Sequence, residues 1–238
     1  MSVFELTRRQ TRVFGDASSG TDVAENWTLP FAGSFVKLRS RNSPNGTWPL
    51  TGHAVNSTAN IMRFRNRFAL QFDLPTEAQW EYACRAGSAR AFDGSQTTAS
   101  NGNHQDNLKD YGWFTENSGG VAHPVGTKLP NAWGLYDMHG NLAEYCLDAV
   151  SDKMGLTDGQ LGSETPVTDP FGAYSGVVSD TQRMFRGGAY SSDFFRCRSG
   201  NRNNESANHP DSAWPSLGYR LVCPLPGATF AEPVIPVE

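Results

Sequence analysis

The chain has 238 residues, of which 38% are hydrophobic, and its formal net charge is −4. This size and composition fit a globular chain of one large domain or two small ones. A surface that follows nucleic-acid phosphates needs clustered lysine and arginine, so the acidic balance excludes nucleic acid as an expected partner. The sequence also has no run of about 18 apolar residues, which excludes a membrane-spanning helix.

The N-terminus and the cysteines limit localisation and chemistry. Residues 1–10 contain no apolar run followed by a cleavage site, so we expect the chain to remain in the cytoplasm unless its N-terminus has been trimmed. The cysteines form no Cys-x-x-Cys motif and are widely spaced, at Cys84, Cys146, Cys197 and Cys223. This spacing argues against a structural zinc site, and it permits disulfides without requiring them.

Capping patterns predict the helices in the first part of the chain. A capping box at residues 7–10 begins a helix that Gly15 closes. Ser57 can cap a second helix, whose inner face carries Ile61, Met62 and Phe64. The strongest pattern is the capping box at residues 76–79, which predicts a helix that ends near Gly87. The basic cluster at residues 63–67 is interpreted as the solvated face of the second helix.

The remaining segments predict short strands and many turns. Residues 16–50 are read as an extended loop with one short strand at 35–38, and residues 68–72 as another short strand. From residue 88 onward short apolar segments alternate with turns, and the chain has 24 glycines and 14 prolines. This pattern predicts a loop-rich α+β domain with a few helices packed on small, twisted sheets. Without a repeat or linker, we expect a single domain at 1–226 and a mobile tail at 227–238.

Six segments in order resemble the formylglycine-generating enzyme, or sulfatase-modifying factor, family. The more extensive matches are residues 74–83, residues 131–144, the Phe-Arg-Gly-Gly segment at 185–188 and the Gly-Tyr-Arg segment within 217–222. Residues 4–7 and 123–126 also fit, so that the similarity extends over nearly the whole chain. The resemblance implies a C-type-lectin-like α+β fold. Family members usually have a further strand region before the segment that matches residues 4–7, and the resemblance leads us to expect that this region is missing here.

The resemblance also implies a structural calcium site. Its ligands would be the Asp137 side chain, the backbone carbonyls of Gly140 and Leu142, and the Glu144 side chain. Hard oxygen ligands on a tight turn are a chemically reasonable set for Ca²⁺. The alternative is that the two carboxylates only accept hydrogen bonds from loop amides.

The residues for the family's copper-dependent oxidation are incomplete. Ser192 stands where the resemblance implies the first copper-binding cysteine, and a hydroxyl cannot replace a soft thiolate ligand. Cys197 matches the second cysteine when counted forward from Gly188, but it falls in a following strand when counted back from Gly218. The family's active-site serine and tryptophan are replaced by Ala189 and Ala143. We therefore expect no catalytic residues and no copper.

Residues 189–216 combine aromatic rings with small polar side chains, as antibody paratopes do. This composition predicts a surface that binds a protein or another macromolecular ligand. The expected ligand-binding residues are Tyr190, Ser192, Asp193, Phe194, Asn201, Asn203, Asn204, His209, Asp211 and Trp214. The segment also resembles the variable region of proteins that diversity-generating retroelements randomise at adenine-containing codons.

Three interpretations of the function remain open at this point: a diversified receptor, a non-diversified binding or structural member of the family, and a copper-dependent formylglycine-generating oxidoreductase that acts on sulfatase cysteines. Arg186 and Arg220 are expected to fix the scaffold rather than to contact a ligand. Four aromatic residues in the motif segments are assigned to the core: Trp80, Trp113, Trp133 and Tyr136.

Overall fold

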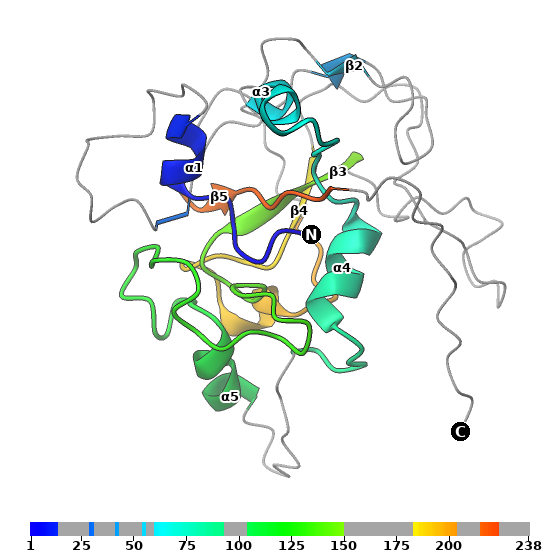
Figure 1. Cartoon of the computed structure of the whole chain (residues 1–238). Coiled ribbons are helices and arrows are strands. Elements are labelled where there is room, and N and C mark those ends of the chain that lie inside the picture. Colours follow the sequence, from blue (N-terminus) through cyan, green and yellow to red (C-terminus); the bar gives the residue numbers. More distant parts are fainter. Residues whose placement is uncertain are drawn as a thin grey trace, which may run out of the picture.

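The computed structural model describes residues 1–13, 29–30, 41–42, 54–55, 60–92, 104–149, 183–203 and 215–223. Its helices are α1 (Arg8–Val13), α3 (Asn60–Phe68), α4 (Glu77–Arg85) and α5 (His104–Tyr111), with a short 3₁₀ helix, η2 (Phe194–Cys197). Its strands are β1 (Arg41–Asn42), β2 (Ala54–Val55), β3 (Ala143–Ala149), β4 (Arg183–Arg186) and β5 (Leu217–Gly218). Figure 1 shows helices and the irregular segment 112–142 around a small central sheet, which is the expected loop-rich α+β class.

The central sheet has the strand order β4-β3-β5. Strands β3 and β4 are antiparallel, with Glu144 opposite Arg186, whereas β3 and β5 are parallel, with Glu144 opposite Gly218. The N-terminal residues lie beside the segment that follows β5, because the amide of Leu6 donates to the carbonyl of Tyr219 at 2.7 Å. Strands β1 and β2 form a separate antiparallel pair.

The two capping boxes begin their helices as the sequence predicts. The hydroxyl of Thr76 accepts from the amide of Gln79, and the Gln79 side chain accepts from the amide of Thr76. Helix α4 ends at Arg85 and is capped by Ala86, which has a φ of 47° and directly precedes Gly87. Thr7 and Gln10 make the same reciprocal pair at the start of α1. Gly15, Ser57 and the strand expected at 35–38 lie outside the described residues.

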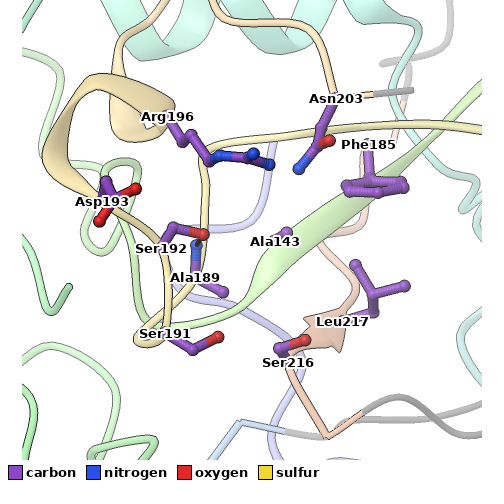
Figure 2. A pocket seen from close by; sticks show the side chains of 10 residues that line it. All are labelled: Ala143, Phe185, Ala189, Ser191, Ser192, Asp193, Arg196, Asn203, Ser216 and Leu217. Carbon is purple, nitrogen blue, oxygen red and sulfur yellow. Dashed lines mark hydrogen bonds between the residues drawn. The ribbon is translucent and has the colours of Figure 1, made fainter. Parts of the chain in front are cut away.

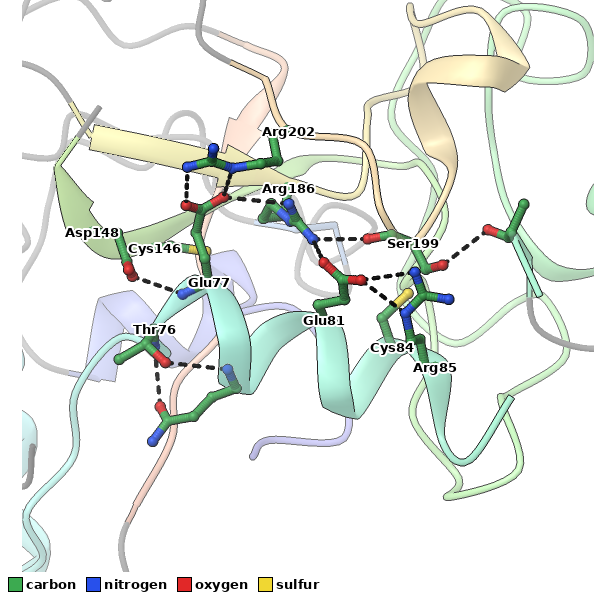
Figure 3. Close-up of polar contacts among 12 residues, drawn as sticks. Thr76, Glu77, Glu81, Cys84, Arg85, Cys146, Asp148, Arg186, Ser199 and Arg202 are labelled. Carbon is green, nitrogen blue, oxygen red and sulfur yellow. Dashed lines mark hydrogen bonds and ion pairs between the residues drawn. The ribbon is translucent and has the colours of Figure 1, made fainter. Parts of the chain in front are cut away.

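Charged side chains attach α4 to the central sheet (Figure 3). The buried guanidinium of Arg186 on β4 pairs with Glu77 at 3.3 Å and also with Glu81, both on α4. Arg202 makes a bidentate contact with Glu77, at 3.0 and 2.6 Å. The amide of Glu77 donates to Asp148 on β3 at 2.7 Å. Arg186 therefore fixes the scaffold, as expected.

Apolar side chains form three buried clusters around this sheet. The largest includes Ile61 and Phe64 from α3 together with Tyr145, Phe185 and Tyr219 from the strand region. A second contains the fully buried Trp80 and Cys84 of α4. The third contains Phe92, Leu108, Phe114 and Cys197. No helix among the described residues is long and apolar enough to cross a membrane.

The elements and the core differ from the sequence analysis at three places. Residues 68–72 are not a strand, because Phe68 still belongs to α3, Ala69 has a φ of 53°, and Phe72 packs against Phe64 and Phe68. Helix α5 was not predicted, because its sequence is mostly polar and shows no apolar periodicity. Leu108 is its buried apolar residue. Trp133 is 47% exposed and contacts Tyr82, which is 57% exposed, so it does not belong to the core.

Candidate functional site

A pocket of about 320 Å³ opens at the end of the sheet where β3 and β5 begin. Figure 2 shows residues from β3, β4, β5, η2 and the intervening loops around it. Small and apolar side chains form one part of the lining: Ala143, Phe185, Ala189 and Leu217. Polar side chains form the other part: Ser191, Ser192, Asp193, Arg196, Asn203 and Ser216.

The loop that borders this pocket is a tight turn held by backbone contacts. The amide of Ala189 donates to Ser192 Oγ at 3.0 Å, and the amide of Ser192 donates to the Ala189 carbonyl at 2.9 Å. Tyr190 is fixed through its backbone, since its amide donates to the Asn141 carbonyl and its own carbonyl accepts from Ser118. These contacts hold the small polar side chains of the turn at the rim of the pocket.

The glycine pair before this turn is required by close packing. Gly188 has a φ of 70°, and a Cβ there would lie 2.7 Å from the sulfur of Cys197. Gly187 has a φ of 91° and faces the ring of Trp80, with a hypothetical Cβ at 3.1 Å. The Gly-Gly motif thus lets β4 pass into the pocket loop against the two neighbouring clusters.

The structure brings together only some of the expected ligand-binding residues. Ser192, Asp193 and Asn203 line the pocket, whereas Tyr190, Phe194 and Asn201 do not. Phe194 instead packs partly against the third core cluster. The remaining expected positions lie outside the described residues: Asn204, His209, Asp211 and Trp214.

Sequence reasoning missed several residues of this pocket, most importantly Arg196. Ser191 and Ser216 share the polar composition of the 189–216 segment, so composition alone could have included them. Arg196 gave no such signal, because it is separated from the other polar positions by aromatic residues. Only the 3₁₀ turn of η2 brings its side chain back to the pocket.

Cys197 lies in the core rather than in the pocket. Its side chain is fully buried with Phe92, Leu108 and Phe114, and its thiol donates to the Asp193 carbonyl at 3.8 Å. Burial, together with nearby Glu116 and Asp193, raises the pKa of this thiol to about 12. It ends a 3₁₀ helix, so the alternative that places it in a following strand is wrong. The lining residues include no thiol or imidazole, and a soft copper ion would find no suitable ligand among them.

A further carboxylate, which the sequence did not reveal, contacts the turn that is expected to bind calcium. Buried Glu5 accepts from the Leu142 amide at 2.8 Å and from the Asn141 side chain at 2.7 Å. Burial, followed by the charges of Asp137 and Glu144, raises the pKa of Glu5 well above its usual range. Glu5 could not be assigned from spacing, because it is 137 positions before Leu142.

The expected calcium ligands differ in how well they fit a cation. One oxygen of buried Asp137 accepts from the Gly126 amide at 2.7 Å, while its Oδ1 has no hydrogen-bond partner. Both oxygens of Glu144 are engaged by Arg220, at 2.7 to 2.9 Å, and Trp80 donates to one of them at 2.6 Å. Across the described residues, no group of three or more His, Cys, Asp or Glu side chains is arranged to hold a metal. Asp137 therefore fits a hard cation and Glu144 does not, and calcium stays a prediction.

Asp137→Asn tests this prediction without disturbing the rest of the turn. Asparagine keeps an acceptor for the Gly126 amide but removes the ionisable carboxyl group, whose pKa is raised mainly by burial. If Asp137 binds calcium, excess Ca²⁺ should raise the melting temperature of the original chain and leave that of the variant unchanged. A melting temperature of the original chain that does not respond to Ca²⁺ would exclude the site.

The fold and the glycine-bordered pocket define a class of small α+β domains, and comparison with known proteins identifies it. Residues 7–225 match the family described as Sulfatase-modifying factor enzyme 1-like domain. The match covers most of the sequence, and the chain belongs to this family.

The chain is similar to curated enzymes of the same family. It is 32% identical to a formylglycine-generating enzyme of Streptomyces coelicolor over 152 residues, which are 62% of this chain and 45% of that protein. It is 33% identical to the formylglycine-generating enzyme of Thermomonospora curvata over 156 residues, 62% of this chain and 48% of that one. The chain thus spans about half the length of these relatives.

Solved structures support the fold. Treponema denticola variable protein 1 has a TM-score of 0.63 and 24% identity, over 92% of this chain and 82% of that one. PvdO from Pseudomonas aeruginosa has a TM-score of 0.60 and 21% identity, over 94% of this chain and 79% of that one. These similarities establish the arrangement of the chain and not its activity.

Proposed function

We propose that this chain is a non-catalytic binding member of its family and that it holds part of a macromolecular partner in the pocket beneath the 189–203 segment. The pocket itself carries this proposal. Its lining combines hydroxyl, amide and charged side chains with an apolar wall, as ligand sites commonly do. Phe195, which is exposed and lies in the chain between the lining residues Asp193 and Arg196, offers contact area for a larger partner.

The chemistry of the same positions favours binding over oxidation. Ser192, Ala189 and Ala143, which stand where the family resemblance implies catalytic or aromatic residues, all line this one pocket. The pocket therefore lies where the family's oxidation chemistry is expected. Small side chains stand there in place of the copper-binding cysteine, the active-site serine and the active-site tryptophan. These replacements also enlarge the space available for a bound group.

A matched pair of bulky substitutions tests the pocket as a binding site. Ser191 is exposed at the rim, so Ser191→Trp should fold normally and block the pocket. Leu129 is 53% exposed and does not line it, so Leu129→Trp is the control. Peptides selected from a random displayed library on the original chain should lose at least tenfold in affinity for Ser191→Trp only. Equal binding to both variants would reject the pocket as the site.

The similarity in fold to a protein named variable protein 1 supports a diversified receptor as a specific form of this function. In that case, isolates of one species should differ at pocket-facing positions such as Ser192 and Asn203 through changes at adenines. They should share the buried Arg186 and Arg220. Sequencing the locus in several isolates decides this, and identical codons throughout would leave a non-diversified binding protein.

The alternative is a copper-dependent formylglycine-generating oxidoreductase that acts on sulfatase cysteines, which the names of the curated relatives favour. A copper titration of the reduced protein, with oxygen consumption measured on a sulfatase-type peptide, tests it. Because Cys197 is buried apart from the pocket, we expect neither tight Cu(I) binding nor peptide oxidation. Either activity would restore the enzyme interpretation.

A further inference from the structure

The proposed binding pocket is rich in hydrogen-bond donors. Arg196 contributes a guanidinium with five N–H groups and no acceptor, and Asn203 contributes an amide. Figure 2 shows these two side chains directed toward one another at one end of the pocket, with the Ser192 hydroxyl on the same side of the loop. Two further hydroxyls, those of Ser191 and Ser216, line the opposite end.

Local hydrogen bonds fix the positions from which these donors act. Ser192 Oγ already accepts from the Ala189 amide at 3.0 Å, so its own O–H proton is available to donate elsewhere. The Arg196 amide donates to the Asp193 carbonyl at 2.9 Å within η2, and the Asn203 amide donates to the Phe185 carbonyl at 3.3 Å. The donors thus stand on a loop whose backbone is already satisfied, which reduces the ordering that binding requires.

The acidic residue in the lining does not oppose these donors directly. Asp193 is exposed, and in Figure 2 its carboxylate lies on the side of the loop away from Asn203. It should weaken the attraction for an anion without occupying the space between Arg196, Asn203 and Ser192. This arrangement makes Asp193 a useful internal probe of the charge of the ligand.

Apolar side chains complete the lining of the pocket, with Phe185 and Leu217 beside Ala143. A ligand that satisfies both the donors and the apolar part of the lining carries an anionic group on a short apolar stem. Planar carboxylates match the fork of a guanidinium and form strong charge-assisted hydrogen bonds with it. We propose that the pocket recognises a carboxylate carried by a peptide segment of the partner, with Arg196 as its main charged contact. This inference rests on the proposed function and specifies the chemistry of its ligand.

Three pools of acetylated tripeptides, randomised without aspartate or glutamate, test the inference and separate the possible sources of the carboxylate. The first pool ends in a free carboxylate, the second is amidated, and the third is amidated but has one aspartate added. Binding of each pool is measured by equilibrium dialysis with mass spectrometry. We expect the first or third pool to bind and the amidated pool to bind at least tenfold more weakly, and the pool that binds identifies a chain terminus or an acidic side chain.

Variants of two neighbouring arginines provide the matched comparison. Arg196→Gln should weaken binding of the carboxylate pools by tenfold or more, as expected for loss of a hydrogen bond to a charged group. Arg198→Gln should leave it unchanged, because Arg198 is exposed, donates to the Phe195 carbonyl and does not line the pocket. Asp193→Asn should strengthen binding by removing a like charge.

The outcomes separate this inference from the proposed function. Binding that Ser191→Trp abolishes but that amidation and Arg196→Gln leave unchanged would overturn carboxylate recognition and keep the binding pocket. If no pool binds the original chain, whether charged or amidated, both the inference and the peptide-binding function fail. Equal losses for Arg196→Gln and Arg198→Gln would also overturn the inference, since they would indicate nonspecific charge attraction.

Discussion

Arg220→Met should destabilise the folded chain by about 3–5 kcal/mol, the usual cost of leaving a buried charge without its partner. Arg220 is completely buried, and its guanidinium donates to both oxygens of Glu144. It also donates to the carbonyls of Ser2, Val3 and Tyr136 at 2.7 to 3.0 Å. The substitution therefore removes the attachment of the N-terminal segment to β3 as well as an ion pair.

The charges around Arg220 make this loss larger than that of an isolated pair. Burial alone lowers the pKa of a guanidinium, but Glu144, with Glu5 and Asp137 nearby, raises the pKa of Arg220 overall. Without the arginine, three buried carboxylates lie close together without a compensating cation. They would have to take up protons or admit water, and either response loosens the packing around the turn at Gly140–Leu142.

Urea denaturation of three variants measures this effect. Arg85→Met is the control, because Arg85 pairs with Glu81 where their side chains are 30% and 21% exposed, so that it should cost about 1 kcal/mol or less. Adding Glu144→Gln to Arg220→Met should recover part of the stability, since both charges are then removed. The interpretation is wrong if Arg220→Met costs no more than Arg85→Met.

The sequence revealed the role of Arg220 but not its partners. Its position in the Gly-Tyr-Arg motif indicated a scaffold residue, and the structure confirms this. The residues that surround it, however, come from positions as distant as Ser2, Tyr136 and Glu144. Local patterns carry no information about such long-range contacts, which also explains why Glu5 was missed.

Local signals worked best where the physics is local. The capping box at Thr76 involves residues within one helical turn, so its sequence determines its geometry. Trp133 shows the opposite case, because its aromatic character predicts burial while its actual position depends on where the 131–134 turn lies. The Trp133 side chain lies at the surface beside Tyr82. The pocket was partly predictable for a similar reason: polar composition pointed to Ser192 and Asn203, but only the path of η2 places Arg196 beside them.

Gly140→Ala should have the second large effect and lower the free energy of unfolding by more than about 4 kcal/mol. Losses of this size arise from overpacking and from forbidden backbone geometry. Gly140 has a φ of 113°, and an added Cβ would lie 2.1 Å from the carbonyl oxygen of Trp113. That oxygen cannot move away freely, since it accepts from the Asn141 amide at 2.8 Å. The Gly140 amide also donates to the Gly187 carbonyl, so that the clash would disturb the entry to the pocket loop.

Gly134→Ala separates the clash from the cost of a positive φ. Gly134 has a φ of 76°, but a Cβ there would meet no heavy atom within 4 Å. Its substitution should therefore cost only the strain of a left-handed residue, about 1–2 kcal/mol. If thermal and urea unfolding place Gly140→Ala within about 1 kcal/mol of Gly134→Ala, the Trp113 backbone must be able to yield. The turn would then depend on its hydrogen bonds to Glu5 and Gly187 rather than on close packing, and the glycine of the motif would be needed only for its φ.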